Sequence, residues 1–222
     1  MSRHCILILA LLLGRSPLLG ATLEGKRILE KRIDEFVLDG APNAVWEVQL
    51  SWLCKKARVP CGIESLNEEY VAVGGKTIRF QNESLANILD RVVSQQPGYR
   101  WFEENGVINI APRARSVLTK RKIKTLDIVD IPLDKAAAEV ICQKFGRRCY
   151  AAARAISMMG VGNPSQYAFR KVTLHLSNVS FREALNAVVR KDVDAIWILH
   201  PNKTQNGDFR IAIDQQQRES VK

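Results

Sequence analysis

Residues 171–190 read KVTLHLSNVSFREALNAVVR, and residues 76–93 read KTIRFQNESLANILDRVV. In both stretches an alternating apolar pattern, typical of a half-buried strand, gives way to apolar residues at helical spacing. A polar Asn-x-Ser turn separates the two patterns, at 82–84 and again at 178–180. Each stretch therefore predicts a strand, a tight turn and a helix.

The predicted helices show the clearest periodicity in the chain. Their apolar residues share the spacing i, i+3, i+4, i+7, i+8 and are Leu85, Ile88, Leu89, Val92 and Val93, then Phe181, Ala184, Leu185, Val188 and Val189. Ser180 and Glu183 form a capping box, and Ser84 can cap its helix in the same way without the acid. In the preceding strand we expect Phe80 and Leu176 to face inward.

Other matches extend the similarity over most of the chain. Trp101 and Trp197 are separated by the same 96 residues as the two helices. Upstream, CKKARVPC begins at Cys54 and CQKFGRRC begins at Cys142, an offset of 88 residues. Because these anchors occur in the same order, we interpret the chain as two copies of one fold.

The remaining elements complete a repeated unit. We expect first strands at 33–38 and 126–131, each followed by a helix, and a further strand near the second cysteine of each pair. The apolar stripes expected for these helices are Val45, Val48, Trp52 and Leu53, then Leu133, Ala137, Val140 and Ile141. Asn-Gly pairs at 105–106 and 206–207 predict closing hairpins. The predicted fold is α+β: two tandem β-α-β-β-α-β-β modules, each with two helices and small sheets.

The composition is that of a folded protein. The chain has 222 residues, of which 46% are hydrophobic and 25% charged, with a formal net charge of +10. This excludes a disordered tail and a fibrous repeat. We expect modules at 22–113 and 125–214, a basic linker at 114–124 and a polar tail at 215–222.

The first 21 residues have the pattern of a secretory signal peptide. Arg3 precedes nine apolar residues, Cys5 to Leu13, and a small-residue cleavage site follows near Ala21. Nine residues are too few for a helix that spans a bilayer, so we expect no transmembrane span in the mature chain. A short anchoring or buried helix is the alternative interpretation.

The paired cysteines fit an exported protein. Four cysteines at repeated spacing predict two disulfides, Cys54–Cys61 and Cys142–Cys149, with reduced buried thiols as the alternative. Neither pair has the spacing of a zinc site or a redox motif. We find no motif for a catalytic residue, a cofactor or a metal, and interpret His175 and His200 as surface residues.

The stretch KVTLHLSNVSFREALNAVV resembles the short N-terminal domain of bacterial secretins and TonB-dependent receptors. KTIRFQNESLANILDRVV is a looser match, and KAAAEVICQKFGRRCY is similar to the first helix and return strand of that family. The resemblance covers about 90 residues in each copy. It implies a periplasmic module that docks onto other envelope proteins and is not an enzyme. It carries over no catalytic residue, and paired cysteines are not a general mark of the family.

Two further segments are candidate contact sites. The basic stretch between the copies contains Arg113, Arg115, Lys120, Arg121, Lys122 and Lys124. It is either a solvated linker or a strip that contacts an anionic surface. The insertion in the second copy carries Met158, Met159, Tyr167 and Phe169, which would either contact a partner or cover the core. The sequons at Asn82 and Asn178 are better explained by the turns that contain them.

We therefore expect a non-enzymatic adaptor in the periplasm that joins an envelope protein complex, with association to the outer membrane. Docking would use sheet edges or the cleft between the repeats. The alternative is a binder of peptidoglycan or another anionic envelope polymer that uses the basic linker. We expect no nucleic-acid partner, because the chain is exported and no aromatic residues interleave with the basic strip.

Overall fold

The computed structural model describes residues 25–41, 44–65, 75–114, 116–119, 122–145, 170–192, 194–201 and 209–215. The first copy contains β1 (Arg32–Leu38), α2 (Trp46–Ala57), β2 (Cys61–Glu64), β3 (Ile78–Ser84), α3 (Leu85–Val93), β4 (Tyr99–Glu104) and β5 (Val107–Pro112). The 3-10 turn η1 (Val117–Thr119) leads to β6 (Lys122–Pro132), α4 (Leu133–Phe145), β7 (Lys171–Ser180), α5 (Phe181–Val189), β8 (Ala195–Pro201) and β9 (Phe209–Gln215).

The α+β class is confirmed, and the first copy has the predicted order of elements. The second copy follows the same order in the residues described. Its strand near Cys149 and its Asn206-Gly207 turn lie outside those residues. In the first copy, Asn105 and Gly106 have positive φ angles of 53° and 80°, as the predicted hairpin turn requires.

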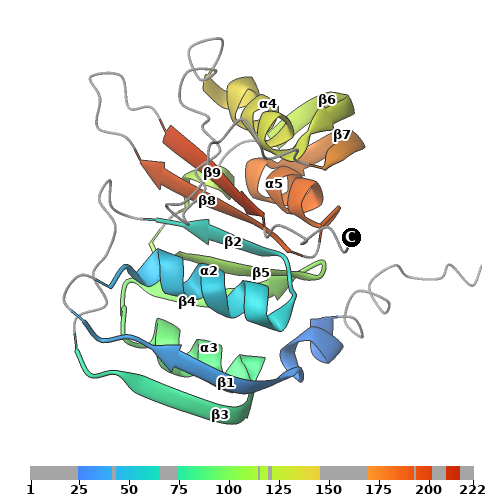
Figure 1. Cartoon of the computed structure of the whole chain (residues 1–222). Coiled ribbons are helices and arrows are strands. Elements are labelled where there is room, and N and C mark those ends of the chain that lie inside the picture. Colours follow the sequence, from blue (N-terminus) through green and yellow to red (C-terminus); the bar gives the residue numbers. More distant parts are fainter. Residues whose placement is uncertain are drawn as a thin grey trace, which may run out of the picture.

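The strands form one sheet that crosses both copies and two outer pairs (Figure 1). The central sheet has the order β4-β5-β2-β8-β9, and the outer pairs are β1-β3 and β6-β7. The expectation of separate small sheets in each copy is therefore corrected for the central one. Its β2 pairs in parallel with β5 of its own copy and with β8 of the other copy.

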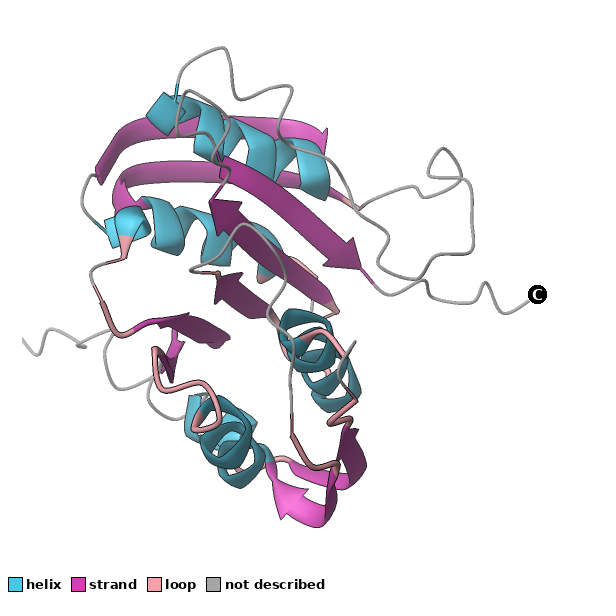
Figure 2. Ribbon diagram, turned by 90° about the vertical axis from the view of Figure 1, so that its left-hand side faces the viewer, coloured by secondary structure: helices cyan, strands magenta, loops and turns pink. Residues whose placement is uncertain are grey.

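The two copies cover opposite faces of this central sheet, so that helices and strands alternate in layers (Figures 1 and 2). Alternate residues of β8 enter different cores: Ile196 and Ile198 pack with the first copy, whereas Trp197 and Leu199 pack with the second. Each copy thus buries its helices between the central sheet and its own outer pair. The sheet is the wall that the two cores share.

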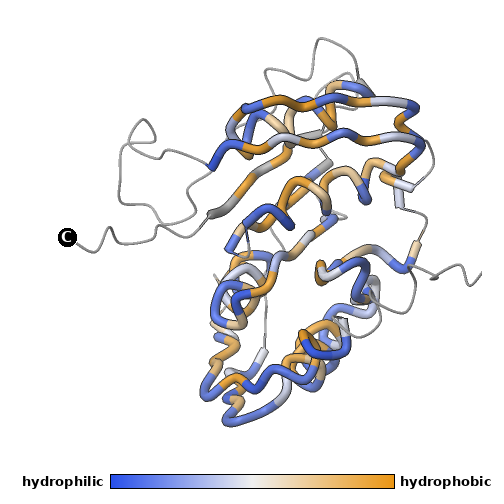
Figure 3. Tube along the Cα trace, turned by 90° about the vertical axis from the view of Figure 1, so that its right-hand side faces the viewer, coloured by the Kyte–Doolittle hydropathy of each residue, from blue (hydrophilic) through white to orange (hydrophobic). Residues whose placement is uncertain are grey.

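Equivalent strands pair in the same register in both copies, which supports the duplication. Arg32 lies opposite Ser84 in the first outer pair, and Lys122 lies opposite Ser180 in the second. The burial pattern of β1 recurs in the first seven residues of β6. Hydrophobic and hydrophilic residues alternate along β6 and β7, at the top of Figure 3.

The turn into the second helix is also the same in both copies. Asn82 and Asn178 have φ angles of 50° and 53°, in the left-handed region that asparagine tolerates well. This explains both sequon positions structurally. Ser84 accepts a hydrogen bond from the N–H of Asn87, and Ser180 forms the predicted capping box with Glu183. The donated Ser180 N–H holds the pKa of the Glu183 carboxyl below its usual range.

Three expectations are corrected by the structure. Trp52 of the predicted α2 stripe is 47% exposed, whereas Trp46 is fully buried. The helix carries apolar residues on two faces, and the face that turns inward is the one that carries Cys54, which is bonded to β2. The predicted linker is shorter than expected, because β6 begins at Lys122. His200 is buried rather than on the surface.

Candidate protein-interaction site

The seam between the copies is built by β2 and β8. Gly62 lies opposite Trp197 in the parallel register, and the N–H of Ser65 donates to the carbonyl of Leu199 at 2.8 Å. A Cβ at Gly62 would overlap the indole of Trp197. Glycine therefore allows this indole to cover the neighbouring strand, and the seam closes tightly at this point.

A buried polar cluster lies at the end of the seam. Arg182 of α5 donates from Nη2 to Oε2 of Glu64 at 2.7 Å, and both side chains are at least nine-tenths buried. The Ser116 hydroxyl lies 2.9 and 2.6 Å from the two Glu64 oxygens and accepts the N–H of Leu118 at 3.1 Å. The cluster joins the first copy, the connection between copies and the second copy.

Beside it, a second polar chain connects β8 to β4 through α5. The indole N–H of Trp197 donates to Oδ1 of Asn186 at 3.0 Å, and the Asn186 amide donates to Glu104 at 3.2 Å. Burial raises the pKa of the Glu104 carboxyl above its usual range, and nearby Glu183 raises it further. Arg182 and the amide hydrogen bond act in the opposite direction.

These contacts join residues of both copies. Both oxygens of Glu64 accept hydrogen bonds, and Ser116 lies beside this carboxylate, not beside an imidazole base. The Arg182 guanidinium also lies over the ring of Phe102 on β4, 5.3 Å from its centroid. Within the described ranges, no group of three His, Cys, Asp or Glu side chains could hold a metal ion.

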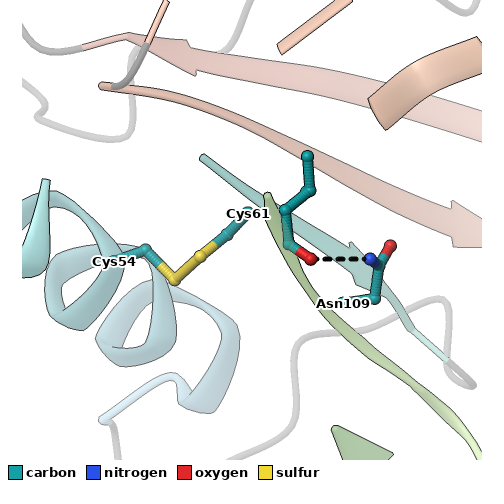
Figure 4. The surroundings of a disulfide bond; sticks show 4 residues. Cys54, Cys61 and Asn109 are labelled. Atoms are coloured by element: carbon teal, nitrogen blue, oxygen red, sulfur yellow. Dashed lines mark hydrogen bonds between the residues drawn. A yellow bond between two sulfur atoms is a disulfide. The ribbon is translucent and has the colours of Figure 1, made fainter. Parts of the chain in front are cut away.

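The first predicted disulfide is present. Cys54 of α2 is bonded to Cys61 of β2, with 6.3 Å between the Cα atoms (Figure 4). Figure 4 also shows the Asn109 amide donating to the carbonyl of Val107, at 3.1 Å. Cys142 is disulfide-bonded as well, but Cys149 lies outside the described residues, so their pairing stays a prediction.

Half of the predicted basic strip lies in the described residues. Arg113, Lys122 and Lys124 are exposed, and Nε of Arg113 donates to the carbonyl of Pro97 at 3.1 Å. The rest of the strip and all four residues of the predicted partner loop lie outside, namely Arg115, Lys120, Arg121, Met158, Met159, Tyr167 and Phe169.

The outer edge of β4 is the remaining candidate site. In the part of the sheet that the structure describes, β4 pairs only with β5. Trp101, in the middle of β4, is partly buried against the first core, and its indole N–H donates to Asp90 at 2.8 Å. An edge strand carries backbone groups that another strand can bond, so β4 is suited to strand addition.

Sequence reasoning missed Glu64, Ser116 and Arg182. One signal was available for the arginine: the repeat offset of 96 places it at the position of Ala86, on a helix that is otherwise well matched. A charge that replaces alanine in one copy only indicates a contact that only that copy makes. The sequence contained no sign of which residues it would contact.

Comparison with known protein families, with curated proteins and with solved structures gives no significant match for this chain. The resemblance to the short N-terminal domain of secretins and TonB-dependent receptors therefore stays a prediction. Of the helices in the described residues, none is both long enough and apolar enough to cross a bilayer.

Proposed function

We propose that this chain is an exported, non-enzymatic adaptor of the bacterial cell envelope that docks to protein partners through the edges of its sheets. The disulfide between Cys54 and Cys61 fits an oxidising compartment such as the periplasm. The apolar segment at residues 5–13 supplies the route of export. The resemblance of both copies to an envelope docking module agrees with this role.

The observation that carries the proposal is the pairing of β2 with β8. Here one copy recognises the other by parallel strand addition, so this fold already performs edge docking inside the chain. The described side chains at the seam are buried against one another, among them Glu64 and Arg182. We therefore place partner docking at the outer edges and not in the cleft between the repeats.

The test is site-specific photo-crosslinking in intact cells. A photoreactive residue replaces Arg79 on β3, Arg100 on β4 or Lys124 on β6, all of which are exposed. The control position is Lys56, exposed on helix α2. We expect a discrete protein adduct from at least one strand position and none from the helix. Adducts from no strand position, with the chain folded and exported, would overturn the proposal.

The basic strip supports the second candidate, binding to peptidoglycan or another anionic envelope polymer. Lys122 and Lys124 are exposed on β6, and Arg113 is exposed just before the connection. If this is the function, the chain cosediments with purified cell wall at low salt, and K122Q/K124Q weakens the binding. The control is K171Q, an exposed lysine of the same outer sheet. Equal binding by both variants would count against this candidate.

A further inference from the structure

The duplication allows strands β4 and β8 to be compared residue by residue. The indole N–H of Trp101 donates to Asp90, and the indole N–H of Trp197 donates to Asn186, at 2.8 and 3.0 Å. Both pairs span 11 residues, and both connect the strand to the helix before it. Each strand then turns back into an antiparallel partner, β5 or β9. β4 and β8 are therefore equivalent strands in equivalent surroundings.

These strands differ in what lies beside them, and at the end of β4 the buried Gly25 lies against the Glu103 side chain. The side of β8 that faces away from β9 is bonded to β2, with Cys61 opposite Ile196 and Glu64 opposite Leu199. The equivalent positions on β4 run from Arg100 to Glu103, and no strand in the described residues pairs there. Trp197 is completely buried, whereas Trp101 is only partly buried. In the first copy, the edge of β4 is therefore equivalent to the side of β8 that is bonded to β2 in the second copy.

We propose that the outer edge of β4 binds, in parallel, a strand of a partner protein that carries glycine opposite Trp101 and apolar residues beside that glycine. This inference rests on the proposed function and names the edge and the partner chemistry. The template is β2 itself, in which Gly62 lies against Trp197 between Cys61 and Ile63. The register would place the glycine at Trp101 and its apolar neighbours opposite Arg100 and Phe102.

The β2 strand of a second copy of this chain is not available as the partner strand. The Gly62 strand of another copy is already bonded on both sides, by β5 and β8. Within the chain, the second repeat has Tyr150 after Cys149 at the position where the first repeat has Gly62 after Cys61. A tyrosine cannot occupy a position where even a Cβ would overlap the indole.

The seam and the β4 edge differ in what they offer to the last residue of the docked strand, the position that Glu64 occupies in β2. At the seam, Glu64 is paired with the buried Arg182. On the first copy, Ala86 stands at the position equivalent to Arg182, so helix α3 supplies no guanidinium there. A buried carboxylate without a partner is costly, so the β4 edge favours an uncharged residue over glutamate at this position.

The test uses synthetic peptides and nuclear magnetic resonance of the full mature chain. The probe is the peptide of residues 59–65 with C61A and E64Q, and the control is the same peptide with G62Y added. We expect shifts of the Trp101 indole and of the amides of residues 100–103. We expect the control to bind at least about tenfold more weakly, because its side chain would overlap the indole.

Three outcomes would overturn this inference: no shifts at β4, equal binding of the two peptides, or concentration-dependent self-association that protects β4 without a partner. Because W101A could disturb folding, the second variant is E103P, which removes a backbone N–H that points away from β5 and should abolish the peptide-induced shifts. Crosslinks from β3 or β6 without peptide binding at β4 would sink the inference and leave the proposed function standing. The absence of all strand crosslinks would sink the proposed function itself.

Discussion

Replacing Arg182 with methionine tests whether the buried cluster holds the copies together. Methionine retains much of the volume and the apolar stem but removes the guanidinium that bonds Glu64 at 2.7 Å. The exposed fractions of the two side chains are only 6% and 4%. The substitution therefore leaves a carboxylate that water cannot solvate and that keeps the Ser116 hydroxyl beside it.

The expected cost is about 3–5 kcal/mol of unfolding free energy, the range for breaking a buried ion pair by removing one partner. The chain contains a matched control. Lys171 and Asp130 are also 2.7 Å apart, but their side chains are 59% and 68% exposed. Because water screens this pair, K171M should cost less than about 1 kcal/mol.

The assay is urea unfolding of the oxidised mature chain, followed by circular dichroism and by tryptophan fluorescence. The double variant E64Q/R182M should recover most of the loss, because no buried charge remains and glutamine still accepts from Ser116. If R182M costs no more than K171M, or if the double variant is less stable than R182M, the role assigned to this cluster is refuted.

Three further predictions concern other parts of the structure. Because the pKa of Glu104 is raised in the folded state, the folded state binds more protons than the unfolded state as this carboxyl titrates. The contribution of Glu104 to stability therefore falls as pH rises. E104Q should therefore raise the midpoint of thermal unfolding at pH 7, and the gain should vanish below about pH 4. Replacing Cys54 and Cys61 with alanine should lower the unfolding free energy by about 2.5 kcal/mol in urea titrations, and an unchanged value would contradict a stabilising role for this disulfide. W197F leaves the buried Asn186 amide oxygen without its donor and should lower the unfolding free energy by about 1–3 kcal/mol. W101F removes an exposed hydrogen bond and should lower it by less than about 1 kcal/mol. Equal losses in the same urea titration would contradict the greater importance of the buried hydrogen bond.

Local sequence patterns predicted the elements whose structure depends on near neighbours. The helices α3 and α5 bury all the apolar residues expected from their spacing, including Leu89 and Leu185. The cap at Ser84 and the capping box at Ser180 are confirmed. In each case the interacting groups lie within a few residues, so the sequence contains both partners of the contact.

The sequence did not predict burial correctly where a helix has two apolar faces or where a contact distant in the sequence determines which side chain is buried. Helix α2 has apolar residues on two faces, and Trp52 was assigned to the core although Trp46 occupies it. His200 is predicted to lie on the surface, although it is buried where β8 pairs with β9. Spacing alone cannot rank two possible faces, because burial depends on what packs against the helix.

The sequence by itself determined the strand-turn-helix unit that both copies share, the order of elements in the first copy and the disulfide between Cys54 and Cys61, because these depend on local motifs and short separations. Only the tertiary structure decided that β2 and β8 join the copies into one sheet. Only it brought Arg182 to Glu64 across 118 residues of sequence. Contacts over such distances are determined by how whole surfaces fit together, and no local pattern of residues encodes that fit.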